Sequence, residues 1–129
     1  MSIKWQDINS VNVAEFDAQH KILVGLVNKL AKKKDKKSIT EILKDLGQYA
    51  AYHFKAEENY FNKFDYPAKD VHSSQHKSFV KKLKVLEKKH TQGKLELPEL
   101  NDFMGQWWIN HINHIDFEYG NFLNQHGVF

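Results

Sequence analysis

Four stretches of the sequence repeat apolar residues with the period of an amphipathic helix, and residues that end helices separate them. The second stretch stops at Tyr66-Pro67, because proline disfavours helical geometry in the residue before it. Gly93 suits the left-handed position after the third stretch, and Pro98 suits the first turn of the fourth. The pattern predicts an all-α fold, an antiparallel up-down-up-down four-helix bundle with short links.

Capping signals predict where the helices begin and end. The residues before Asp17 show no sustained period, so we expect an extended N-terminal arm and Asp17 as the N-cap of the first helix. Ser38 and Glu41 have the spacing of a capping box for the second helix. We expect the fourth helix to end before Gly120 and the remaining residues to form a short C-terminal segment.

Length and composition favour one small domain. A chain of 129 residues leaves no room for a second domain of ordinary size, so we expect a single domain over residues 1–129. The absence of cysteine removes disulfides, iron–sulfur clusters and thiolate zinc sites. No apolar run approaches the roughly 20 residues of a membrane helix, and the N-terminus lacks the layout of a signal peptide. We therefore expect a soluble cytoplasmic protein without membrane insertion.

The net charge of +3 comes from lysine, which occurs in runs such as Lys32 to Lys34 and around Lys81 and Lys82. Such runs could contact nucleic acid or an anionic surface. The sequence contains no arginine, however, which is the residue best suited to read bases, and lysines on exposed helix faces keep a protein soluble. We therefore predict no nucleic-acid partner, and the sequence identifies no protein partner.

Histidine and carboxylate side chains recur on the predicted helices at spacings that can bring them together. They are His20, His53, Glu57, His72, His76, His111 and Asp116. Residues four apart lie on one helix face, one turn apart, so His53 pairs with Glu57 and His72 with His76. In an antiparallel bundle the start of one helix lies beside the end of the next, so the whole set can reach one depth. Buried carboxylates are costly unless they are paired or bind a metal, which favours a metal site.

The size of this set indicates two metal ions, because seven ligands are too many for one tetrahedral zinc. Imidazole suits iron, zinc and copper, and carboxylates can bridge two hard ions. With two octahedral ions, five histidines, two bridging carboxylates and a bridging hydroxide leave about one position open for a small diatomic ligand. A set with only two carboxylates also favours reversible oxygen uptake over the oxidative catalysis of carboxylate-rich di-iron bundles.

The motifs around these residues resemble the hemerythrin family over nearly the whole chain. The stretch from Phe16 to His20 resembles its first-helix motif, and the stretch from His53 to Glu58 resembles its H-F-x-x-E-E motif. His72 to His76 matches H-x-x-x-H, and His111 to Tyr119 matches H-I-x-x-x-D-x-x-Y. Myohemerythrin, a member of this family, is a known up-down four-helix bundle. The resemblance, to the single-domain bacterial form, implies an oxygen-binding protein that is not an enzyme, with molecular oxygen as its partner.

The resemblance also implies a role for each side chain. One iron would be held by His72, His76 and His111, and the other, which keeps the open position, by His20 and His53. Glu57 and Asp116 would bridge the two irons together with a hydroxide or oxide. An oxygen pocket that excludes water would be formed by Leu23, Phe54, Trp107, Trp108 and Ile112, although plain core packing explains these positions equally well. Trp108 stands where the family often has leucine, so its bulk bears on ligand access.

A spacing of five places His111 and Asp116 about 140° apart on an ideal α-helix. We therefore expect a local π-type widening there, or a side chain that reaches round the helix. The remaining histidines, His90, His114 and His126, match no family position and are predicted to lie on the surface or outside the ligand set.

Two other functions are compatible with the sequence. A di-iron enzyme that reduces peroxide or nitric oxide would need an acid–base group at the open site and a route for electrons, and the sequence identifies neither. An oxygen or iron sensor would use the lysine-rich faces to dock a partner. Sensors of this family usually carry a fused signalling domain, so we expect carriage or storage of oxygen.

Overall fold

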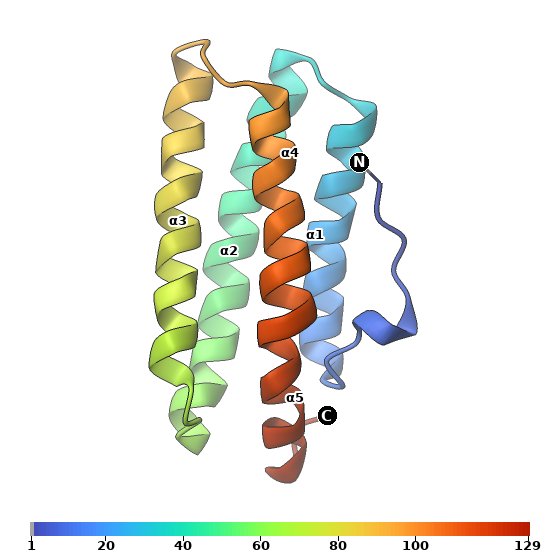
Figure 1. The fold of residues 1–129 in the computed structure, drawn as a ribbon, viewed down its shortest axis with the longest axis vertical. Coiled ribbons are helices and arrows are strands. Elements are labelled where there is room, and N and C mark those ends of the chain that lie inside the picture. The colour runs from blue at the N-terminus through green and yellow to red at the C-terminus, as the bar shows by residue number, and fades with distance from the viewer. Residues whose placement is uncertain (1) are drawn as a thin grey trace.

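The computed structural model describes residues 2–129, and helices make up most of it. The elements are a 3₁₀ turn at Asp7–Asn9, α1 at Ala14–Lys32, α2 at Lys36–Phe64, α3 at Lys69–Thr91, α4 at Leu97–Gln106, a π-helical segment at Trp107–Ile115 and α5 at Asp116–Gln125. The last three are continuous and together form the fourth helix of an antiparallel up-down-up-down bundle (Figure 1). The predicted fold is therefore confirmed, and residues 2–129 contain no strand.

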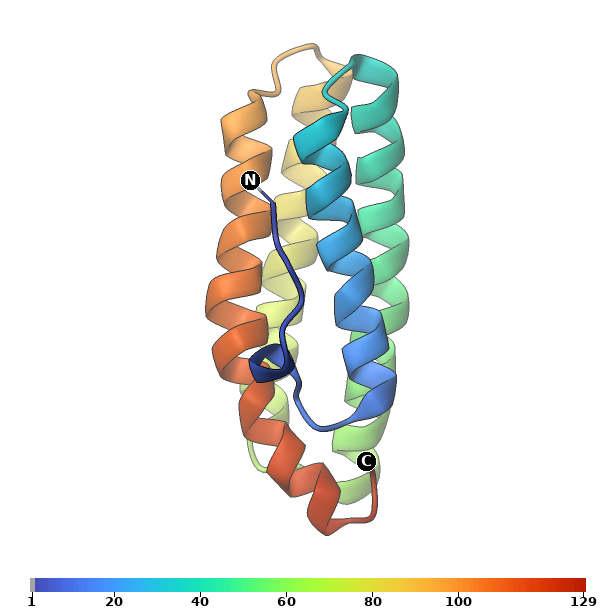
Figure 2. The same cartoon turned by 90° about the vertical axis from the view of Figure 1, so that its right-hand side faces the viewer.

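The N-terminal arm runs along the seam between α1 and the fourth helix (Figure 2). Asn28 of α1 holds it through both its side-chain atoms, accepting from the backbone N–H of Ile3 at 2.7 Å and donating to the carbonyl of Ile3 at 2.8 Å. Lower down, the carboxylate of Asp17 accepts hydrogen bonds from the backbone N–H of Val11 and the hydroxyl of Ser10. The prediction that Asp17 is the N-cap was wrong, because α1 begins at Ala14 and Asp17 instead fastens the arm.

The second helix also begins earlier than predicted. Its N-cap is Asp35, whose carboxylate accepts from the backbone N–H of Ser38 at 3.1 Å and from the Ser38 hydroxyl at 2.7 Å. The capping box predicted at Ser38 was therefore wrong, because Ser38 is already within the first turn. The far end agrees with the prediction, since α2 stops at Phe64 and Asp65 adopts a left-handed conformation before Pro67.

Gly120 does not end the fourth helix, contrary to the prediction, because α5 continues to Gln125. The reason for a glycine is a close approach: a Cβ atom here would overlap the carbonyl oxygen of Val11 in the N-terminal arm. The predicted short C-terminal segment is thus mostly helical. Gly93 has a positive φ of 71° just beyond α3, and Pro98 lies in the first turn of α4, so both of these predictions are confirmed.

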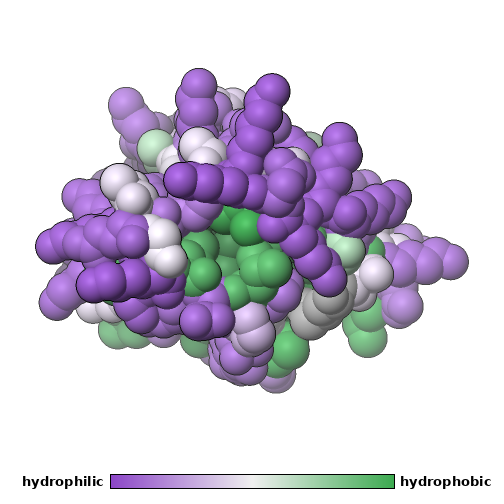
Figure 3. Space-filling model, turned by 90° about the horizontal axis from the view of Figure 1, so that it is seen from above, coloured by the Kyte–Doolittle hydropathy of each residue, from purple (hydrophilic) through white to green (hydrophobic). Residues whose placement is uncertain are grey.

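Two apolar clusters fill the bundle, and the buried histidines and carboxylates lie between them. The larger cluster contains Leu23, Leu30, Leu46, Leu86 and Leu100, with others, and the smaller contains Phe16, Phe61, Tyr66, Tyr119 and Leu123 with Val11 and Val13. At the end where the α1–α2 and α3–α4 links lie, the larger cluster reaches the surface in an apolar hollow with a polar rim (Figure 3). Among the described residues, no helix combines the length and apolar character that crossing a membrane requires.

Candidate metal centre

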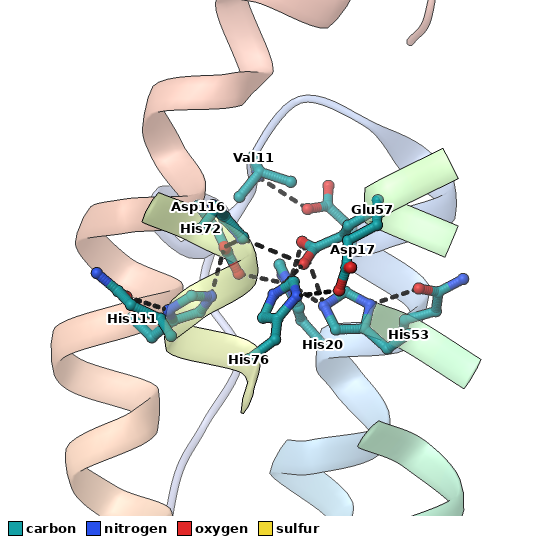
Figure 4. Close-up of polar contacts among 12 residues, drawn as sticks. Val11, Asp17, His20, His53, Glu57, His72, His76, His111 and Asp116 are labelled. Atoms are coloured by element: carbon teal, nitrogen blue, oxygen red, sulfur yellow. Dashed lines mark hydrogen bonds and ion pairs between the residues drawn. The ribbon is translucent and has the colours of Figure 1, made fainter. Parts of the chain in front are cut away.

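The structure brings the seven predicted ligand residues to one depth of the bundle (Figure 4). α1 contributes His20, α2 contributes His53 and Glu57, α3 contributes His72 and His76, the π-helical segment contributes His111 and α5 contributes Asp116. Every one of these side chains is at most 3% exposed. The sequence spacing therefore led to a set of polar groups that four separate helices direct inward.

The side chains form two groups that share Glu57. One group consists of Glu57, His72, His76 and His111, and the other of His20, His53, Glu57 and Asp116. Within each group the possible ligand atoms lie within 4.8 Å of one another. This is the arrangement expected of two neighbouring cation sites rather than one.

Each carboxylate divides its two oxygens between the histidines of both halves. Oε1 of Glu57 lies 3.0 Å from Nε2 of His76, and Oε2 lies 3.3 Å from Nε2 of His53. Oδ1 of Asp116 lies 3.0 Å from Nε2 of His111, and Oδ2 lies 3.1 Å from Nε2 of His20. Both carboxylates therefore have the geometry of bridging groups.

Hydrogen bonds on the outer side of the rings orient three of the histidines. Nδ1 of His76 donates to Oε2 of Glu58, and Nδ1 of His111 donates to Oε1 of Gln75, both at 2.8 Å. Nδ1 of His53 donates to Oε1 of Gln19. Because these oxygens accept, the ring protons lie on Nδ1, and the Nε2 lone pairs face the centre.

The charges around the centre shift the pKa values of its groups. Burial and the nearby Glu57 carboxylate raise the pKa of Asp116, but the imidazoles of His111 and His20 outweigh them and hold it below its usual range. Burial likewise opposes ionisation of Glu57, whose pKa is nevertheless lowered by His53, His72 and His76. Burial lowers the pKa of His111. Burial also opposes the charge on His72, but the carboxylates of Asp116 and Glu57, 3.0 and 3.3 Å away, overcome it and raise the pKa of His72 to about 9. The two buried carboxylates are thus ionised, and their negative charges favour binding of a cation.

Several of these inward atoms form no hydrogen bond of normal geometry within residues 2–129, although each lies 3.0 to 3.3 Å from a group of opposite type across the centre. They are Oε2 of Glu57, Nε2 of His76, Nε2 of His111 and both carboxylate oxygens of Asp116. Proteins rarely leave buried acceptors unpaired, because each one costs free energy. Lone pairs of imidazole and carboxylate that converge in this way fit metal cations such as iron.

Four of the five predicted pocket residues are buried near the same centre, and Trp107 is partly buried. Leu23 and Ile112 are fully buried. Trp108 belongs to the larger cluster, and its ring centroid lies 6.0 Å from that of Trp5 in the N-terminal arm. Phe54 stacks on His76 at 3.9 Å and 5°, and Trp107 stacks on His111 at 3.8 Å and 9°. Two of the five pocket residues thus lie flat against histidines of the group that contains His72.

Sequence reasoning missed three residues that contact the histidines. Gln19 directly precedes His20, and Gln75 directly precedes His76. The only signal in the sequence was that each carries a neutral oxygen able to accept a hydrogen bond from an imidazole N–H. Tyr49, one turn before His53 on α2, stacks on the His53 ring at 5.3 Å and 16°. Burial, and then the charges of Glu57 and Asp116, raise the pKa of Tyr49 well above its usual value.

The other three histidines lie outside the centre, in agreement with the prediction. Nε2 of His90 lies 2.8 Å from the hydroxyl of Thr40, and Nδ1 of His126 donates to the carbonyl of Phe122. His114 is exposed although it falls within the π-helical segment.

Comparisons with known proteins agree on one family. Residues 11–123 match the family described as Hemerythrin HHE cation binding domain. A bacteriohemerythrin of Methylococcus capsulatus is 34% identical over 113 residues, which cover 84% of this chain and 86% of that protein. A hemerythrin-like protein of Naegleria gruberi is 33% identical over 115 residues, which cover 89% of this chain and 88% of that protein. The crystal structure of a wild-type hemerythrin has a TM-score of 0.83 and 31% identity, and covers 92% of this chain and 95% of that one.

Proposed function

This chain belongs to the hemerythrin family, and on that premise we propose that it binds molecular oxygen reversibly at a non-haem di-iron centre, for carriage, storage or delivery. We further propose that residues 1–129 form one hemerythrin-like domain. The observation that carries the proposal is the division of the oxygens of Glu57 and Asp116 between two groups of histidines. Two carboxylates placed in this way can bridge two cations.

The histidines divide unequally between the two proposed irons. His72, His76 and His111 would hold one iron, and His20 and His53 would hold the other. With Glu57, Asp116 and a hydroxide or oxide shared between the two irons, the first iron would have a full set of ligands and the second would keep one position open. When bound, the iron pair would supply the electrons and the open position that reversible oxygen binding requires.

The chain itself would orient the histidine rings and exclude water from the pocket. Gln19, Gln75 and Glu58 accept the outer protons of their histidines and hold the Nε2 lone pairs toward the centre. Leu23 and Ile112 are fully buried and would keep water from the oxygen pocket. Water exclusion favours release of intact oxygen over its loss in a reduced form.

A single experiment tests this function. The protein is loaded with ferrous iron without air, the metal is counted, and the visible spectrum is recorded while oxygen is added and removed. We expect two irons per chain and an absorption band that appears with oxygen and fades on degassing. His111→Ala should lower the iron content, whereas the exposed His114→Ala, only three residues away, should leave it unchanged.

The same experiment separates the alternatives. Iron that oxidises once and does not return, together with rapid consumption of peroxide or nitric oxide, would assign the centre to catalysis. One metal per chain would contradict a di-iron centre altogether. A protein partner that binds only the iron-loaded form would favour a sensor.

A further inference from the structure

Two buried hydrogen-bond donors, one in the larger cluster and one packed against it, form no hydrogen bond of normal geometry in the described part of the chain, although the Trp107 indole is close enough to act on the Tyr49 hydroxyl. They are the hydroxyl of Tyr49 and the indole Nε1–H of Trp107. Tyr49 is 5% exposed, and the polar atoms of both residues are out of contact with the surface. An unpaired buried donor costs free energy, so its retention needs an explanation beyond packing.

Both donors lie on the same side of the metal centre. Tyr49 precedes His53 by one helical turn, and Trp107 precedes His111 by one turn. α2 and the fourth helix run in the same direction, so the two donors lie at one level of the bundle (Figure 1). The ring of Phe54 links them, with its centroid 6.5 Å from that of Tyr49 and 5.6 Å from that of Trp107.

Leu23, one of the residues proposed to form the oxygen pocket, lies at the same level. Leu23 follows His20 by three residues on α1, which runs in the opposite direction, and it is fully buried in the same cluster as Tyr49. Tyr49 lies flat on His53, in the half with two histidines and the proposed open position. The other unpaired tyrosine, Tyr119, belongs to the smaller cluster on the opposite side of the centre.

A surface groove reaches Tyr49 from outside. It lies between α1 and α2, has a volume of about 330 Å³, and includes Tyr49, His53 and Gln19 in its lining. The groove thus ends against Tyr49, His53 and Gln19 and does not include the fully buried His20. These side chains are what separates a small ligand in the groove from the proposed open position.

We propose that the Tyr49 hydroxyl donates a hydrogen bond to the small ligand held beside His20 and His53, and that Trp107 Nε1–H is a second donor in the same pocket. The inference rests on the proposed function. A ligand that carries or gains negative charge on binding accepts such a bond more strongly than a neutral one. The pocket thereby favours small electron-accepting or anionic ligands over neutral, non-reducible ones of the same size.

The test compares Tyr49→Phe with Tyr60→Phe, a control on the same helix whose hydroxyl donates to Glu15 and which does not line the groove. The ferrous proteins are used to measure the rate of oxygen release, and the ferric proteins to measure azide affinity from the visible spectrum. In Tyr49→Phe, oxygen release should be about tenfold faster and azide binding about tenfold weaker, as expected for one lost charge-assisted bond. Tyr60→Phe should match the unmodified protein, and Trp107→Phe should show a change in the same direction as Tyr49→Phe.

Two further readouts separate a ligand contact from a structural role. Tyr49→Phe should keep its iron content, and its metal-free form should unfold at the same or a higher urea concentration, because an unpaired hydroxyl has been removed. Unchanged oxygen release and azide affinity in Tyr49→Phe would overturn the inference, as would loss of stability without a change in azide affinity. Failure of the unmodified protein to release oxygen would contradict the proposed function alone, since the azide measurement still tests Tyr49.

Discussion

Nε2 of His111 lies 3.0 Å from Oδ1 of Asp116, although the two residues are five positions apart on one helix. A regular α-helix would turn their side chains about 140° away from each other. The backbone N–H of Asp116 instead donates to the carbonyl of His111, at the end of the π-helical segment Trp107–Ile115. Because residues five apart share one face of a π-helix, the widening directs both side chains to the centre. The predicted π-type widening is confirmed.

Metal-free protein should lose stability as the pH rises from about 6.5 to 9. Burial lowers the pKa of His72, but hydrogen bonds with Asp116 and Glu57 raise it from 6.5 to about 9. The folded chain therefore holds a proton that the unfolded chain releases, and the resulting stabilisation is complete below pH 6.5 and lost through pH 9. Urea unfolding of the metal-free protein across this range measures it. The iron-loaded protein should not show this decline, and a flat profile for the metal-free form would contradict the assignment.

Leu23→Gln should speed the irreversible oxidation of the oxygenated protein. Leu23 is fully buried beside His20, and a polar side chain there admits water to the proposed pocket. The rate is followed as decay of the visible absorption in air. Leu30→Gln is the control, because Leu30 is 1% exposed on the same helix but lies away from the centre. Equal oxidation rates in the two variants would mean that Leu23 only fills the core and does not protect the proposed pocket from water.

Trp108→Leu should both destabilise the protein and speed the exchange of oxygen. The indole is buried against Trp5 of the N-terminal arm, so a smaller side chain leaves a cavity that costs about 2 kcal/mol or more. The proposed pocket would become more accessible through that cavity. Stopped-flow oxygen binding and urea unfolding measure the two effects. Trp5→Leu is the comparison, because it removes the same contact between the Trp5 and Trp108 rings but leaves Trp108 in place. Identical rates of oxygen binding in the two variants would mean that Trp108 does not limit access to the proposed pocket.

Gly120→Ala should lower the free energy of unfolding by about 1 to 3 kcal/mol, because its Cβ would meet the carbonyl oxygen of Val11 and force two backbones apart. Gly25→Ala is the matched control: it lies within α1, and a Cβ there meets nothing within 4 Å. That variant should gain about 0.5 to 1 kcal/mol, since alanine is the better helix former. Urea unfolding that shows the same change in both variants would exclude the close approach.

Features that depend on neighbouring residues were predictable from the sequence. The helix ends near Pro67 and Gly93 were correct, because proline and glycine act on the backbone within one or two residues. The spacing of His111 and Asp116 was enough to require a widened helix. The shared faces of His53 with Glu57 and of His72 with His76 also followed from helical period, since two residues four apart lie on one helix face whatever the other helices do.

Other features depend on contacts between distant parts of the chain. Asp17 has the local character of an N-cap, yet its carboxylate is used to hold Val11 and Ser10 of the arm. Gly120 has the local character of a helix stop, yet it is needed because Val11, more than a hundred residues earlier, passes against it. The outer partners of the histidines and the unpaired hydroxyl of Tyr49 arise in the same way. Local sequence was enough for the helices, their period and the inward positions of the polar residues. The packed bundle was needed for the helix starts, the convergence of those residues and the polar contacts around the centre, because these require two segments to meet.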